Sequence, residues 1–311
     1  MQERTVTPDI RTKFHAGIIV LALCLALCGC AHPIASSEDS RENAIPFMLT
    51  AHNNIVVKSI LNDRDELDLM LHTATAELTL TEEAVRASTS LRFTDSTQVE
   101  AWGGRAESRY SDGNRLRIGG FLRDELRVWE NRNSGPGTDG KFGLDFFDGR
   151  IVEIDFDRGL ILIHARLPQS STDYHKLALQ AEGGELFVEA DCVIAGTPHR
   201  NRFLVHSGYA GGLLLDDAFV ANTGLDRKVV ITEQSALQDS YGNSIQVRKG
   251  LMPILVLGES RLQNVPVGFF SGAVGAQKIS VIGGDILKRF NLIFDLKDKS
   301  LYLRERNAAS G

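Results

Sequence analysis

The sequence predicts an all-β protein in which one chain forms two similar β-barrel lobes. The composition, with 15 Phe, 29 Gly and only 8 Pro, fits many short strands and tight turns better than a helical bundle. An apolar strand that ends in a histidine occurs twice in the chain. Each copy is followed by a glycine-acid turn and a further apolar strand. A repeat of this length indicates two copies of one structural unit.

The repeated stretches are LDLMLHTATAELTL, with His72, and RFLVHSGYAGGLLL, with His206. The later segments begin at Gly143 and at Gly283, and they align without a gap. Weaker matches between the two halves use nearly the same offset. The duplication is therefore predicted to cover the whole folded part, as lobe 1 and lobe 2.

The element pattern along the chain agrees with short strands. Residues 81–88 begin with Thr and two Glu, which predicts one or two helical turns. The run Ser111-Asp112-Gly113-Asn114 predicts a hairpin turn, because Asp-Gly tolerates the positive φ of tight hairpins. Apolar and alternating runs predict strands over residues 55–60, 67–71, 78–80, 228–232, 245–247 and 251–257.

The arrangement resembles the aspartic proteases of the retropepsin-like and pepsin-like kind. In that family each lobe carries a loop of two hydrophobic residues followed by Asp, Thr or Ser, and Gly, with a hydrophobic-hydrophobic-Gly turn behind it. Residues 203–208 and 282–287 match the second-lobe pattern closely, and the resemblance covers nearly the whole folded chain. His72 and His206 stand where the family has aspartate, and Ala74 stands where it has glycine. The resemblance implies acid-protease-like barrels whose catalytic pair has changed.

The change of residue type decides the expected chemistry. Two facing carboxylates share a proton, since like charges that close cannot both ionise, and the ionised one activates water. Imidazoles at His72 and His206 remove that anionic acceptor, although a histidine pair can still perform acid-base chemistry. The favoured hypothesis is a pseudoprotease that binds a peptide or envelope component in the cleft between the lobes. The alternative is an active peptidase or hydrolase that uses the histidine pair, and a third possibility is a structural lipoprotein with a closed cleft.

Other residues acquire expected roles from the same resemblance. The hydroxyls of Thr73 and Ser207 are expected to hydrogen-bond across the lobe interface and hold the two loops together. Asp145 and Asp285 belong to the turns behind the loops, where a structural role is favoured over catalysis.

Two hairpins stand where the family's flaps fold over a substrate. Their expected tips are Trp102-Gly103 and Tyr241-Gly242. Glycine at a tip permits bending and close approach of the backbone. The competing interpretation places Trp102 in the core of lobe 1 and Tyr241 on the surface.

The sequence predicts no metal and no cofactor. His72 and His206 would supply two nitrogen ligands, whereas zinc normally takes three or four protein ligands, and no third can be named from the sequence. Of the four cysteines, only Cys192 lies outside the N-terminal segment, in an apolar run that predicts a buried small hydrophobe.

The N-terminal segment predicts export and anchoring. Basic residues precede an apolar run too short for a stable membrane span and of the length of a signal-peptide core. The run ends in Leu27-Cys28-Gly29-Cys30, which resembles a bacterial lipobox with Cys30 as the lipidated residue. Cys28 is a competing site, and plain secretion is the other alternative. Because Ala31 rather than Asp follows, an outer-membrane destination facing the periplasm is expected, with the membrane reached through the lipid anchor.

These observations divide the chain into five predicted segments. A net charge of −6 without a long basic run argues against a nucleic-acid partner, whose phosphates require clustered Lys and Arg. The predicted segments are a signal peptide over 1–29, a polar tether over 30–45, lobe 1 over 46–170, lobe 2 over 171–306 and a tail over 307–311.

Overall fold

The computed structural model describes residues 43–93, 95–101, 104–238, 244–270 and 277–306, which belong to one compact unit. The predictions for the signal peptide, the tail and nearly all of the tether fall outside these residues, as do Cys30, Trp102, Gly103, Tyr241 and Gly242. The described part is mostly β and contains two similar closed barrels, which confirms the predicted fold class.

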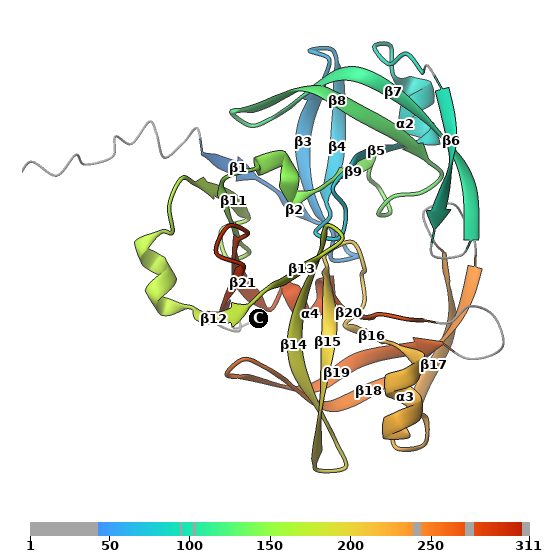
Figure 1. The fold of residues 1–311 in the computed structure, drawn as a ribbon, viewed down its shortest axis with the longest axis vertical. Helices are drawn as coiled ribbons and strands as arrows, with labels where there is room; N and C mark the ends of the chain where they lie inside the picture. The colour runs from blue at the N-terminus through green and yellow to red at the C-terminus, as the bar shows by residue number, and fades with distance from the viewer. Residues whose placement is uncertain (1–42, 94, 102–103, 239–243, 271–276, 307–311) are drawn as a thin grey trace, which may run out of the picture. The chain divides into compact units, whose positions relative to one another are not determined.

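In lobe 1, six strands close into a barrel in the order β3, β4, β9, β5, β8 and β7, and β7 pairs back onto β3 (Figure 1, blue to green). Strands β2 and β6 extend the same sheet at its ends. The bounds are β2 Met48–Leu49, β3 Ile55–Leu61, β4 Asp65–Leu71, β5 Leu78–Thr81, β6 Asp95–Ala101, β7 Gly104–Ile118, β8 Phe121–Asn131 and β9 Gly140–Phe142. Helix α2 (Glu82–Ala87) follows β5, and the 3-10 turn η1 (Leu144–Phe147) follows β9.

Lobe 2 repeats this plan. Its barrel has the order β14, β15, β20, β16, β19 and β18, closed by pairing between β18 and β14, with β13 and β17 at the ends of the sheet (Figure 1, yellow to orange). The bounds are β13 Gln180–Glu182, β14 Glu185–Ile194, β15 Thr197–His206, β16 Leu213–Leu215, β17 Ile231–Gln238, β18 Ser244–Leu257, β19 Ser260–Phe270 and β20 Ser280–Gly283. Three short helices, α3 (Asp217–Thr223), η3 (Leu225–Arg227) and α4 (Gly284–Leu287), lie in the connections.

A third sheet takes strands from both halves of the chain. Its order is β1, β11, β10, β21, β22 and β12, and β10 pairs with β21 across the middle. The bounds are β1 Ala44–Pro46, β10 Ile151–Asp155, β11 Leu160–His164, β12 His175–Ala178, β21 Phe290–Asp295 and β22 Ser300–Glu305. The 3-10 turn η2 (Gln169–Asp173) precedes β12. The two halves of the chain thus share this third sheet, which the pairing of β10 with β21 joins.

Alternation of side chains places the core. In β4, Leu67, Leu69 and Leu71 point into a large buried apolar cluster, whereas Asp68 and Met70 lie on the other face, as a strand with a period of two requires. The same large cluster contains core residues of both barrels and of the third sheet. Burial of this continuous core holds the fold together, because it removes most of the apolar side chains from water.

Some local predictions are confirmed. Thr81 caps helix α2, and its hydroxyl accepts a hydrogen bond from the Ala84 amide at 3.2 Å. The two glutamates of the first turn lie where the positive end of the helix favours them. The turns after β10 and β21 also match each other, because Asp155 accepts from the Arg158 amide and Asp295 from the Asp298 amide.

Other local predictions are wrong. The predicted hairpin turn at 111–114 lies inside β7, where the pairing with β8 shifts register. Gly113 uses its positive φ of 70° there, and Asn114 donates to the Ser111 carbonyl at 2.7 Å. A bulge therefore uses the same residue types as a turn. Residues 245–247 and 251–257 belong to one strand, β18, and the strand expected at 228–232 begins only at Ile231.

None of the helices in the described part of the chain is long and apolar enough to cross a membrane.

Candidate functional site

The two repeated histidines meet where the lobes join. His72 directly follows β4 and His206 is the last residue of β15, so the equivalent strand of each barrel delivers one imidazole. The ring centroids are 4.5 Å apart, and the rings are inclined at 63° in an edge-to-face arrangement. His72 is buried and His206 is half-buried. We call the site "the seam" and define it as His72, Thr73 and Ala74 of lobe 1 with His206, Ser207 and Gly208 of lobe 2.

Four hydrogen bonds across the seam lock the two loops together. The Thr73 amide donates to Ser207 Oγ at 3.0 Å, and the Ser207 amide donates to Thr73 Oγ1 at 3.0 Å. Each hydroxyl donates in turn to a carbonyl of the opposite strand, Thr73 to Val205 at 2.6 Å and Ser207 to Leu71 at 2.7 Å. All four hydrogen bonds are buried, so each one gives a partner to polar groups that water cannot reach. These are the contacts that the resemblance implies for Thr73 and Ser207.

The loops differ in one position that the sequence singled out. A β-carbon placed on Gly208 would lie 2.6 Å from Nε2 of His72, so only glycine leaves room for that ring. Ala74 is tolerated in lobe 1, where it packs against a small apolar cluster of lobe 2. The Ala74 amide donates to His72 Nδ1 at 3.3 Å, which leaves Nε2 as the proton-bearing nitrogen of the neutral ring. His206 Nδ1 is buried and has no hydrogen-bond partner among the described residues.

The glycine-acid turns support the loops from behind. The His72 amide donates to the Phe142 carbonyl at 2.9 Å, and the Gly284 amide donates to the Tyr209 carbonyl at 2.7 Å. Asp285 forms ion pairs with Lys288 at 3.0 Å and Arg289 at 2.8 Å within its own turn. Although burial alone would raise the pKa of Asp285, the hydrogen bonds from these two cations lower it. Burial raises the pKa of Asp145 in the other turn.

Sequence analysis missed one charged residue of this region, Lys141. It lies in β9 between β4 and β5, opposite Met70 on one side and Thr79 on the other. Its ammonium charge acts on both imidazoles of the seam. A comparison of the two repeats could have found it. Gly140-Lys141-Phe142-Gly143 aligns with Ser280-Val281-Ile282-Gly283, so a lysine stands where the other repeat has a valine.

Burial controls the charge states at the seam. It lowers the pKa of His72 well below its ordinary 6.5, and the charges of His206 and Lys141 lower it further. Burial and then Lys141 lower the pKa of His206 to about 4. Both rings are therefore neutral at pH 7. Burial also lowers the pKa of Lys141 to about 8, against the opposing effect of Glu77. Lys141 thus keeps its charge at neutral pH at a free-energy cost.

This arrangement limits the chemistry of the pair. A dyad of carboxylates offers an anionic acceptor for water and a shared proton, whereas two neutral imidazoles offer neither. An imidazole with a pKa near 4 is a weak base at pH 7, since general bases work best with a pKa near the operating pH. The ammonium of Lys141 further opposes any charging of the rings.

The described residues contain no group of three or more His, Cys, Asp and Glu that could hold a metal ion. Two of the remaining histidines contact carboxylates far from the seam in sequence, His164 with Glu153 at 2.8 Å and His175 with Glu259 at 3.0 Å. Cys192 is fully buried in β14, and burial raises the pKa of its thiol to about 12, which makes it unreactive at neutral pH.

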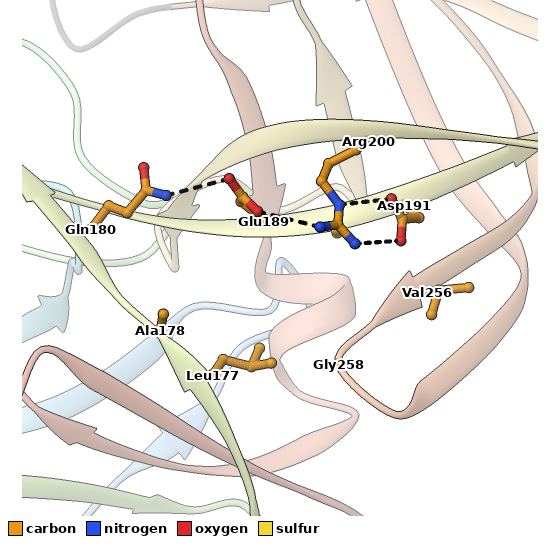
Figure 2. A pocket seen from close by; sticks show the side chains of 9 residues that line it. Leu177, Ala178, Gln180, Glu189, Asp191, Arg200, Val256 and Gly258 are labelled. Atoms are coloured by element: carbon orange, nitrogen blue, oxygen red, sulfur yellow. Dashed lines mark hydrogen bonds and ion pairs between the residues drawn. The ribbon is translucent and has the colours of Figure 1, made fainter.

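Two cavities lie away from the imidazole pair. One, of about 290 Å³, lies in lobe 2. Figure 2 shows that Arg200 points toward Asp191 and Glu189 there, and it pairs with them at 3.1 Å and 3.8 Å. Because Arg200 already pairs with two carboxylates, its charge is not free for an anionic ligand, and this cavity is a weak candidate for an anion site. A second cavity, of about 530 Å³, lies in lobe 1 behind the His72 loop and is lined by charged side chains of both signs.

Two hairpins extend from the barrels, β6 with β7 and β17 with β18. In each, the outer strand is an edge of its sheet. Their tips, which include the predicted flap residues, lie outside the described residues. The sequence matches no known protein family and no curated protein.

Proposed function

We propose that this chain is an aspartic-protease-like envelope lipoprotein that binds an extended peptide at the seam without cutting it. The observation that carries this proposal is the combination of two loops joined by four hydrogen bonds with two neutral imidazoles at their centre. The groups that fix the two loops to each other are present, whereas the acid-base pair of the resembling proteases is replaced. Such a site favours binding over hydrolysis.

Two features support an extended peptide as the ligand. Among the described residues, β6 and β17 each pair with a neighbouring strand on one side only, and peptides commonly bind by adding a strand to such an edge. A small apolar cluster of lobe 2 adjoins the seam through Ala74 and Tyr209, which gives this side of the seam an apolar character. Alternating side chains of a strand would then meet different halves of the site.

The N-terminal sequence supports the location. Signal-peptide features over 1–29 and the lipobox-like Cys30 would place the folded lobes at the cell envelope, facing the periplasm from the outer membrane. The polar tether would separate them from the lipid surface.

The test uses the full chain, a random decapeptide library and two tryptophan variants. Ala74→Trp fills the seam, and Ala178→Trp places the same side chain in the cavity of Figure 2. After incubation at pH 5 to 8, protein-bound peptides are separated by gel filtration and all peptides are analysed by mass spectrometry. We expect wild type and Ala178→Trp to retain uncut peptides and Ala74→Trp to retain few.

Two results would overturn the proposal. Cleavage that disappears in His206→Ala would favour the alternative, an active hydrolase that uses the histidine pair. If Ala178→Trp abolishes the retention of peptides and Ala74→Trp does not, the binding site lies in the lobe 2 cavity instead. Thermal unfolding of each variant shows that it is folded, and amide exchange of wild type with bound peptide gives a readout that requires no variant. Slower exchange at residues 72–74 and 206–208 is expected.

A further inference from the structure

The loop between β8 and β9 lies against a buried side-chain amide of lobe 1. Asn54, directly before β3, is 1% exposed, and neither the oxygen nor the nitrogen of its amide has a hydrogen-bond partner among the described residues. A β-carbon on Gly135 of the loop would lie 2.7 Å from Asn54 Oδ1 and 2.8 Å from Met70 Sδ, so the loop backbone covers this amide. The hydroxyl of the neighbouring Ser134 is also buried and has no partner within that part of the chain. The contact between loop and barrel thus leaves polar groups on both sides without hydrogen bonds.

This contact favours a loop that moves. A buried polar group without a partner opposes the closed position, since water would pair with the same group once the loop moved away. The loop leaves the barrel after Asn131 and returns at Asp139, whose carboxylate accepts from the Asp68 amide at 2.7 Å. Between these ends, the Thr138 hydroxyl donates to the Gly135 carbonyl at 2.7 Å. The tip of the loop can therefore swing away from the barrel with its own hydrogen bond intact.

Asn54, by contrast, is fixed beside the seam. Its backbone amide donates to Thr50 Oγ1 at 3.1 Å, and its carbonyl accepts from the Thr50 amide at 3.0 Å. The adjacent Asn53 donates from Nδ2 to the carbonyl of Ala210 at 2.7 Å, and Ala210 follows the seam residue Gly208 by two positions. The turn that carries Asn54 is thus tied to lobe 2 next to the seam.

The chemistry of the Asn54 amide indicates what can replace the loop. Nδ2 donates and Oδ1 accepts, so the amide requires a partner with both an acceptor and a donor. Each residue of an extended peptide offers such a pair, because its backbone N–H and C=O can both bond to the same neighbour. A carboxylate would leave Oδ1 without a donor, and an ammonium would leave Nδ2 without an acceptor.

We propose that residues 132–138 form a lid over Asn54, and that a bound peptide displaces this lid and pairs its backbone with the Asn54 amide. This inference rests on the proposed function and names how lobe 1 holds the peptide. The contact is made with backbone groups, so it is independent of the side chain that the peptide carries there. The peptide supplies the hydrogen bonds that the closed lid does not.

The first test follows amide exchange at residues 133–138 in the protein without peptide. Asn54→Leu replaces the unpaired amide with an apolar group of similar size, so it should hold the lid closed and slow this exchange about tenfold. Gly135→Ala places a methyl group against Asn54 and Met70, so it should push the lid away and speed the same exchange.

Asn291→Leu is the matched control, because Asn291 is equally buried but its amide is paired. Its Oδ1 accepts from the Phe156 amide at 2.8 Å, and its Nδ2 donates to Asp157 at 2.7 Å. This variant should be less stable than wild type in urea titrations and should not slow exchange in the lid. The opposite signs expected for Asn54→Leu and Gly135→Ala keep the test decisive even if the control does not fold.

The second test uses one decapeptide that wild type retains from the random library, with derivatives methylated at one backbone nitrogen at a time. Methylation removes the N–H that Asn54 Oδ1 would accept from. Dissociation constants for wild type and Asn54→Leu are measured by fluorescence anisotropy. We expect one position at which methylation costs wild type about tenfold more affinity than it costs Asn54→Leu.

The outcomes separate the lid from the proposed function. Equal exchange at residues 133–138 in wild type and Asn54→Leu, or a crystal structure with the loop in place and an ordered water paired with the Asn54 amide, would refute the lid while peptide binding stands. Equal losses for both proteins at every methylated position would refute the backbone contact. If wild type retains no decapeptide, the proposed function and the backbone contact fail together, whereas the exchange test still decides on the lid.

Discussion

Replacing Lys141 with methionine should stabilise the fold at neutral pH. The equivalent position of lobe 2 holds Val281 in an apolar cluster, so the barrel accepts an apolar side chain there. The pKa of Lys141 falls from its ordinary 10.5 to about 8. Since one pKa unit corresponds to about 1.4 kcal/mol, folding with this ammonium inside costs about 3 kcal/mol below pH 8. Methionine has a similar length and no charge, so the variant should avoid this cost.

The sign of the pH dependence follows from the same shift. Between pH 8 and 10.5 the unfolded chain binds a proton at Lys141 that the folded protein has lost, so the stability of wild type rises with pH in this window. The variant lacks this group. Its advantage should therefore be largest below pH 8 and disappear above pH 10.5.

Urea unfolding at pH 7 and pH 11 measures both quantities, because the unfolding free energy falls linearly with urea concentration. Lys176→Met is the matched control, since its lysine is largely exposed and should give no comparable gain. A Lys141→Met variant less stable than wild type at pH 7 would refute the reasoning. A gain of equal size at both pH values would also refute it, because burial of the charge could not then be the cause.

Three further predictions concern the seam and the core. Thr73→Val removes the hydroxyl that pairs with the buried Ser207 amide and the Val205 carbonyl of lobe 2. We expect it to lower the unfolding free energy by about 2 to 4 kcal/mol in urea titrations. Unchanged stability would contradict the importance of these bonds. Gly208→Ala should cost about 1 to 3 kcal/mol and displace the His72 ring, as a crystal structure of the variant would show, whereas an unmoved ring would disprove the steric argument. Cys192 should react with a thiol reagent only on unfolding, as peptide mapping by mass spectrometry can follow, and rapid labelling of the folded protein would contradict its burial.

The duplication made the fold predictable. Equivalent strands of the two halves have the same pattern of apolar residues, so the matched runs that end in His72 and His206 predicted two barrels. The structure confirms them. Short-range signals were less decisive. Asp-Gly at 112–113 tolerates positive φ both in a hairpin turn and in a bulge, and only the long pairing of β7 with β8 distinguishes the two. Local chemistry therefore left the alternative open.

The candidate site was predictable in part for a similar reason. The structure brings together His72, Thr73, His206 and Ser207, each of which follows a strongly apolar strand and stands out in the sequence. Lys141 does not stand out, because a single lysine in a strand usually points to solvent. It lies between two strands of one barrel because β9 pairs in parallel with β4. These two strands are far apart in the chain, so the sequence near Lys141 does not reveal the pairing.

The third sheet has a consequence for biosynthesis. Strand β10 of the first half pairs with β21, with Val152 opposite Phe294, and β12 pairs with β22. When the ribosome has released the first barrel, its β10 edge is still without a neighbour, and it stays so until residues 290–295 emerge. Pairing between strands far apart in the sequence slows folding, and until it forms the unpaired strand edge is prone to aggregation. The shared sheet can therefore be completed only when the last two strands, β21 and β22, have been made.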